Sequence, residues 1–180
     1  MKSYKKVIFS AGLLFAVVYF LVWALYVTFV YVPYEDALKK TAVLVNGAMR
    51  EDGYTYGVAL PSFPSFTGNL FINQDTVFYE DGTSDGNISM LIWPSARGKH
   101  IIGITISLYD PKIQEAPKKL PDGTTEYSTE LTDYDFYIDK NMDLLKPKDP
   151  KTREIYQQHY EEVQQICQLA DQKWNIFGDK

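Results

Sequence analysis

The sequence has 180 residues, with 23 Asp and Glu against 18 Lys and Arg, which gives a net charge of −5 at pH 7 with His neutral. All 23 acidic residues but only 15 of the basic ones follow residue 32, so the chain beyond that point carries a charge of −8. This charge argues against nucleic acid as a partner, because phosphate binding requires a positive surface, and against flat adhesion to anionic lipid.

The first element is an apolar stretch, residues 7–32, that contains no charged residue. As a helix it would be about 39 Å long, which is enough to cross a hydrocarbon core of about 30 Å with some tilt. The stretch predicts an uncleaved signal anchor whose first partner is the lipid bilayer. A cleavable signal peptide is the alternative, but its apolar region is shorter and ends in a small-x-small site, and none precedes Pro33.

Basic residues around this stretch predict its direction. Lys2, Lys5 and Lys6 precede it without an opposing acid, whereas Lys39 and Lys40 follow it beside Glu35 and Asp36. The excess of lysine on the N-terminal side predicts that residues 1–6 lie in the cytoplasm and residues 33–180 outside it. We expect the anchor to be held at the two membrane interfaces by Lys5, Lys6, Trp23 and Tyr31, with Tyr26 and Tyr34 nearby.

The 148 residues after the anchor are enough for one domain with a core of its own. The chain has one cysteine, Cys167, so an internal disulfide cannot form. An extracytoplasmic domain without disulfides points to a bacterial cell envelope rather than a eukaryotic secretory route.

The domain opens and closes with predicted helices. Residues 34–50 carry apolar residues at spacings of three and four, and the Glu51-Asp52-Gly53 run predicts the end of that helix. A second helix is predicted from Asp149 as N-cap and Pro150 as first helical residue to about Trp174. Its apolar stripe comprises Ile155, His159, Val163, Ile166, Ala170 and Trp174, with Tyr156, Tyr160 and Cys167 beside it.

Between these helices the apolar period changes from about 3.6 to 2, which is typical of strands. The predicted strands are 54–60, 69–73, 76–80, 87–93, 100–109, and one or two within 125–138, with a tight Gln74-Asp75 turn between the second and third. Short turns between consecutive strands imply an antiparallel meander. The predicted fold is α+β, with a meander sheet of about five to seven strands packed against an N-terminal and a C-terminal helix.

Two segments are candidate partner-binding sites. Phe63 and Phe66 lie in a proline-stiffened tandem tripeptide, where exposed rings would anchor a partner unless the loop tucks them beneath itself. The second is an acidic strand end on which Asp133, Asp135 and Asp139 share one face. The Asp139-x-Asn141-x-Asp143 run opens like a calcium loop, but Leu144 and Pro150 replace the glycine and glutamate that such a loop requires, so we expect a solvated strand end. The proline-containing loop 110–123 is a third, weaker candidate.

Catalytic chemistry has little support. His100 begins a strand and His159 lies on the apolar side of a helix, which is typical of boundary residues. Cys167 is expected to be buried, whereas a nucleophilic thiol needs an exposed, electropositive setting. Ser95 and Lys99 could form a serine–lysine catalytic dyad, but any serine and lysine that lie close in sequence match that pattern by chance. We therefore predict no catalytic residue, no metal site and no cofactor.

The leading hypothesis is a non-catalytic binding or accessory module, anchored in a bacterial membrane, that contacts a membrane or envelope protein. One alternative is a small-ligand sensor or enzyme whose site is assembled from scattered residues. Another is a self-assembling surface subunit whose helices pack through Gly12 and Ala16.

Overall fold

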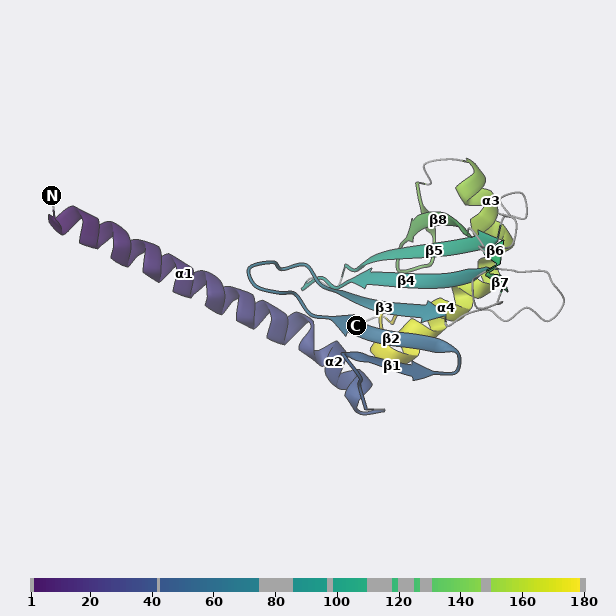
Figure 1. The fold of residues 1–180 in the computed structure, drawn as a ribbon, viewed down its shortest axis with the longest axis horizontal. Coiled ribbons are helices and arrows are strands. Elements are labelled where there is room, and N and C mark those ends of the chain that lie inside the picture. The colour runs from purple at the N-terminus through teal and green to yellow at the C-terminus, as the bar shows by residue number, and fades with distance from the viewer. Residues whose placement is uncertain are drawn as a thin grey trace.

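A computed structural model describes residues 2–41, 43–74, 86–96, 99–109, 118–119, 125–126, 131–146 and 150–178 (Figure 1). Its N-terminal element is the long helix α1 (Lys2–Val30), which begins within the predicted cytoplasmic segment. The chain turns at Tyr31, and the short helix α2 (Val32–Lys39) follows with Pro33 in its first turn. In Figure 1, α1 projects from one end of the molecule and α2 lies against the domain.

The apolar helix is long enough to cross a membrane. Among the described residues, one helical segment, Ile8–Lys39, meets the length and composition of a span, with a mean hydropathy of 2.4. Residues 8–18 are exposed along their whole circumference, while residues from Tyr19 onward are partly covered by the domain. Only the C-terminal part of α1 therefore belongs to the packed structure of the domain.

The domain is built on a seven-stranded antiparallel sheet in the order β1-β2-β3-β4-β5-β8-β9. Its strands are β1 (Ala48–Glu51), β2 (Tyr54–Ala59), β3 (Asn69–Gln74), β4 (Asn87–Trp93), β5 (Ile101–Tyr109), β8 (Leu131–Ile138) and β9 (Leu144–Leu145). A separate pair, β6 (Lys118–Lys119) and β7 (Thr125–Glu126), lies between β5 and β8 in the sequence. The predicted α+β meander is confirmed.

One face of this sheet forms the core. Alternate residues of each central strand point to this inner face, and those of β5 are Ile102, Ile104 and Ile106, each at most 3% exposed. The helices α2, α3 (Pro150–Gln158) and α4 (Tyr160–Trp174) cover it. Burial of branched side chains from a strand face is worth about 1.5–3 kcal/mol per residue, which makes this layer the main source of stability.

The predicted helix over residues 34–50 is wrong beyond Lys39, where α2 ends. Asn46 and Gly47 both adopt positive φ, at 53° and 78°, and reverse the chain so that Val45 bridges Ala48. Two consecutive left-handed residues favour the Asn-Gly pair and end any helix. The next segment is β1, joined to β2 by a second such turn at Asp52 and Gly53.

The remaining predicted strands and helix ends can be compared with the structure where their residues are described. The strands 69–73 and 87–93 are confirmed, whereas Thr76–Glu80, most of the loop 110–123 and the N-cap Asp149 lie outside the described residues. Within the predicted range 125–138, the described strands are the short β7 at its start and β8 from Leu131 onward. Pro150 begins α3 and Trp174 ends α4, as predicted.

The single C-terminal helix that the sequence predicts is instead two helices. His159 leaves helical geometry at φ −108° and ψ 29°, and the axis changes direction there. As a result, α3 covers β8, where Tyr156 packs edge-on against Phe136, and α4 crosses toward β4 and α2. One straight helix could not follow both parts of a twisted sheet.

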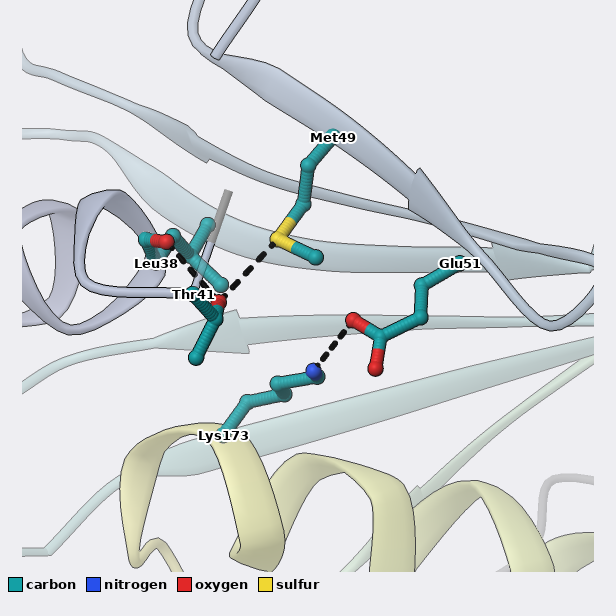
Figure 2. Close-up of polar contacts among 5 residues, drawn as sticks. All are labelled: Leu38, Thr41, Met49, Glu51 and Lys173. Carbon is teal, nitrogen blue, oxygen red and sulfur yellow. Dashed lines mark hydrogen bonds and ion pairs between the residues drawn. The ribbon is translucent and has the colours of Figure 1, made fainter. Parts of the chain in front are cut away.

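Polar contacts join the two ends of the domain at its β1 edge (Figure 2). The Thr41 hydroxyl donates to the Leu38 carbonyl at 2.9 Å and lies 3.7 Å from the Met49 sulfur, which closes the end of α2 onto β1. Glu51 and Lys173 pair at 2.6 Å between β1 and α4, and the ammonium also lies 5.2 Å from the centre of the Tyr56 ring. The edge strand is thereby fixed to both helices.

Candidate functional site

The connection between β2 and β3, residues 60–68, docks on α1; we call it the docking loop. The Tyr19 hydroxyl donates to the Pro64 carbonyl and the Trp23 indole N–H donates to the Ser65 carbonyl, each at 2.8 Å. These bonds join residues more than 40 positions apart in the sequence. Figure 1 shows the loop beside the C-terminal part of α1.

Aromatic rings reinforce this contact. The ring of Phe63 packs edge-on against Tyr19, Phe20 and Trp23, with centroids 5.5–5.9 Å apart. The ring of Phe66 packs in the same way against Tyr19 and Tyr26. Such pairs are worth about 0.5–1.5 kcal/mol each beyond the area they bury. We call these rings the aromatic cluster: Tyr19, Phe20, Trp23, Tyr26, Phe63 and Phe66.

Tyr31 fixes the base of the docking loop. Its hydroxyl donates to the Gly68 carbonyl at 3.0 Å and accepts the Gly68 N–H at 3.1 Å. Gly68 has no room for a side chain, because a Cβ there would lie 2.4 Å from the Ala59 carbonyl oxygen. Tyr31 is 2% exposed, so the expectation that it contacts headgroups is wrong: its polar end is used inside the protein.

The structure thus brings together residues that the sequence assigned to separate roles. Phe63 and Phe66 contact the chain's own helix, including the predicted anchor residue Trp23, and their contact with a partner stays a prediction. Phe63 remains 50% exposed. Lys5 and Lys6 lie near the start of α1.

The opposite face of the sheet is uncovered in the described part of the chain; we call it the open face. Its register groups apolar side chains in two neighbouring cross-strand pairs, because Phe71 opposes Leu91 and Trp93 opposes Ile101. Gly57 and Gly103 lie beneath the rings of Phe71 and Trp93, where a Cβ would lie 2.2 and 3.1 Å from the nearest ring atom. We call this the apolar row: Phe71, Leu91, Trp93, Ile101 and Tyr137.

A polar row runs beside it. Thr55, Asn73, Ser89, Thr105 and Asp135 lie in register across five strands. The Thr105 hydroxyl donates to the Asp135 carboxylate at 2.6 Å. The open face therefore combines exposed apolar side chains with hydrogen-bonding groups, which is the composition of many protein interfaces.

The predicted acidic residues divide between two places. Asp133 and Asp135 are exposed on the open face, and Tyr134, Phe136 and Ile138 point inward as predicted. Asp139 instead organises the turn into β9, because its carboxylate accepts the N–H groups of Asn141 and Asp143 at 2.8 and 3.0 Å. Within the described ranges, no three His, Cys, Asp or Glu side chains are grouped as metal ligands.

Sequence reasoning missed the apolar row. Leu91 and Trp93 alternate with core residues in β4, and Leu91 is 37% exposed while Tyr137 is 47% exposed. The signal that could have found them is an apolar residue on the face of a strand opposite to its core residues. The prediction assigned the run 87–93 to a strand without assigning its residues to the two faces of the sheet.

A cavity of about 660 Å³ lies where α1 meets the domain. Its walls come from the α1–α2 junction, the connection between β4 and β5, and the end of α4, and include Phe29, Tyr34, Ala37, His100 and Trp174. The Trp174 indole nitrogen is buried and has no hydrogen-bond partner among the described residues. Nearby, His100 accepts the Ser95 N–H at 3.4 Å within its own turn.

The core tyrosines make stability depend on pH. Burial raises the pKa of Tyr56 to about 12, with a further contribution from Glu51, and burial likewise raises that of Tyr156 to about 12. Since the pKa of an unfolded tyrosine lies near its usual value of 10.0, the unfolded chain loses these protons at lower pH than the folded chain does.

We expect the free energy of unfolding to be unaffected by these two tyrosines below pH 10 and to fall as pH rises toward 12. Urea titrations across this range should show the decline, and the variant with both Tyr56→Phe and Tyr156→Phe should show a flatter one; an unchanged slope would contradict it.

Cys167 is a structural thiol. Its side chain is 2% exposed in α4, and burial raises the pKa of the thiol to about 12. A thiolate is the nucleophilic form, so this cysteine is unsuited to attack a substrate or to react with alkylating reagents.

Comparison of the chain with known protein families, with curated proteins and with solved structures finds no match.

Proposed function

We propose that this chain is a single-pass protein of a bacterial cell membrane, with its N-terminus in the cytoplasm and its α+β domain outside, that binds another membrane or envelope protein without catalysing a reaction. The observation that carries the proposal is the apolar row on an open sheet face that is fixed to an apolar helix. The lysine bias before the helix supports the orientation, and the single cysteine supports the envelope.

The open face has the features of a binding surface. Ring contact between Trp93 and Tyr137, with centroids 6.4 Å apart, restricts both side chains before any partner arrives. Rigid aromatic side chains lose little conformational entropy on binding and are enriched among the residues that dominate affinity. Asp133 and Asp135 border the row, so the complementary partner surface is an apolar patch flanked by basic residues.

The test is in-cell crosslinking of the full-length protein, followed by purification in mild detergent and identification of the proteins that co-purify. The face variants are Leu91→Ala and Tyr137→Ala. Tyr160→Ala is the matched control, because Tyr160 is also an exposed tyrosine that packs edge-on against a neighbouring ring. A helix variant replaces residues 8–18, which are all exposed, by an unrelated apolar sequence and keeps the aromatic cluster intact.

We expect one protein to co-purify stoichiometrically, to be lost with both face variants and to be retained with Tyr160→Ala and with the helix variant. Loss of the partner only in the helix variant would move recognition to the span and overturn the role of the open face. Absence of any partner from the unsubstituted protein would overturn the proposal itself.

Small-ligand binding is the second candidate function, and the cavity at the α1–α2 junction favours it. The cavity combines apolar walls with the polar groups of Tyr34, His100 and Asn175, which is the usual composition of a ligand site. Native mass spectrometry of the same purified protein distinguishes the two. A stoichiometric small molecule without a protein partner would favour the sensor.

A further inference from the structure

We propose that the docking loop is a second membrane-embedded element, which enters the leaflet on the domain's side and is solvated there by lipid. The inference rests on the proposed membrane span, and it adds a contact that the span alone does not imply. It is carried by the depth at which the loop meets α1, by the pairing of its backbone groups and by its exposed side chains.

The depth follows from helix geometry. Counting from Lys6, the last charged residue before the apolar stretch, Tyr19 lies about 20 Å and Trp23 about 26 Å along the helix axis. A hydrocarbon core of about 30 Å that begins at Lys6 therefore ends beyond both residues, about 10 Å past Tyr19 and about 4 Å past Trp23. Since the docking loop bonds to both side chains, its tip lies at the same depth. Tilt of α1 would deepen it, because a tilted helix needs more residues to cross.

Several backbone groups of the loop are paired, and this depth favours such pairing. Irregular backbone is tolerated in hydrocarbon only where its polar groups find partners within protein. The carbonyls of Pro64, Ser65 and Gly68 accept hydrogen bonds from α1 or from Tyr31 just beyond it. The N–H of Ser65 donates to the Ser62 carbonyl at 2.8 Å, and that of Thr67 to the Ser65 hydroxyl at 3.0 Å. Pro61 and Pro64 have no N–H to satisfy.

The side chains that the loop exposes suit lipid. Leu60 is 42% exposed and Phe63 is 50% exposed, and both lie in the loop that meets α1 at this depth. Residues 53–74 contain no charged side chain, in a domain with a net charge of −8. Segments that lie in the interface bury apolar side chains about 5–10 Å into the boundary between headgroups and acyl chains, which matches the calculated depth.

The experiment places a nitroxide at one position at a time in the full-length protein, in phosphatidylcholine–phosphatidylglycerol vesicles. Ser62→Cys reports the loop tip, Ser10→Cys reports the exposed part of α1, and Gln157→Cys in α3 reports the far end of the domain (Figure 1). All three positions are exposed, so labelling leaves the packing intact. The unsubstituted protein, whose Cys167 is buried, is the labelling blank. Collision rates with dissolved oxygen, which concentrates in hydrocarbon, are compared with those of a water-soluble nickel chelate.

We expect the ratio of oxygen to nickel collisions at position 62 to exceed that at position 157 several-fold and to approach that at position 10. A ratio at position 62 equal to that at position 157, with position 10 in lipid, would overturn the embedded loop and leave the span intact. A nickel-accessible label at position 10 would instead overturn the span, and with it the proposed function.

Discussion

Replacing Leu38 by alanine is expected to lower the free energy of unfolding of the domain by about 2–5 kcal/mol, because the substitution deletes a fully buried branched side chain. Leu38 is 0% exposed in α2, where the helix contacts both β2 and α4. The cavity left behind would lie between three elements, so no single one can relax to fill it. Urea unfolding of the full-length protein in micelles measures the change, with near-ultraviolet circular dichroism as the signal.

Val43→Ala is the matched control for Leu38→Ala. Val43 follows α2 by a few residues and is 88% exposed, so its truncation is expected to change stability by less than about 0.5 kcal/mol. Equal effects of the two substitutions would show that α2 is not packed on the domain in solution.

Replacing Gly68 by alanine is expected to detach the docking loop from α1 and to destabilise the domain by about 1–3 kcal/mol, which is the usual cost of overpacking. The added Cβ would lie 2.4 Å from the Ala59 carbonyl oxygen and 2.9 Å from the Tyr31 ring, so the backbone itself must move. Movement breaks both hydrogen bonds between Tyr31 and Gly68. Hydrogen exchange of the peptide covering residues 61–70, measured by mass spectrometry, should lose its protection.

Gly12→Ala provides the control for Gly68→Ala. A Cβ at Gly12 would meet nothing within 4 Å, and the residue lies inside α1, where alanine is the better helix former. We expect unchanged exchange in residues 61–70. Retained protection in Gly68→Ala would contradict the docking geometry, whereas lost protection in both variants would point to an effect on α1 as a whole.

The sheet was largely predictable from the sequence because its strands obey a simple period. In β5, Ile102, Ile104 and Ile106 alternate with smaller residues, and in β8, Tyr134, Phe136 and Ile138 alternate with polar ones. One buried face and one open face leave this pattern in any antiparallel sheet. The same logic applied strictly to β4 would also have assigned Leu91 and Trp93 to the open face.

The errors arose where a local backbone conformation outweighed an apolar pattern. Residues 34–50 keep helical spacing, yet Asn46 and Gly47 favour a reversal that the spacing cannot reveal. The helix break at His159 likewise could not be predicted from the sequence, because no proline or glycine lies there. It is set by the need to cover two parts of a twisted sheet, which is a tertiary requirement.

The aromatic cluster was predictable only in its parts. Phe63 and Phe66 stood out as rings in a proline-stiffened loop, and Trp23 as an aromatic residue near one end of a span. Their contact joins residues some 40 positions apart, and no period or turn signal relates such distant segments. Identifying the contact required the path of the chain through β2 and β3.

The orientation of the sheet has a consequence for how a partner arrives. In Figure 1 the strands run lengthwise from the end of the domain at which α1 joins it, rather than across α1. When α1 crosses a bilayer, the strands therefore rise from the membrane surface. The open face then points parallel to the membrane plane rather than away from the membrane. The proposed partner, if it lies in the same membrane, would then reach this face by lateral diffusion. Occupancy would depend on surface density rather than on bulk concentration, and only domains of matching height above the lipid would engage.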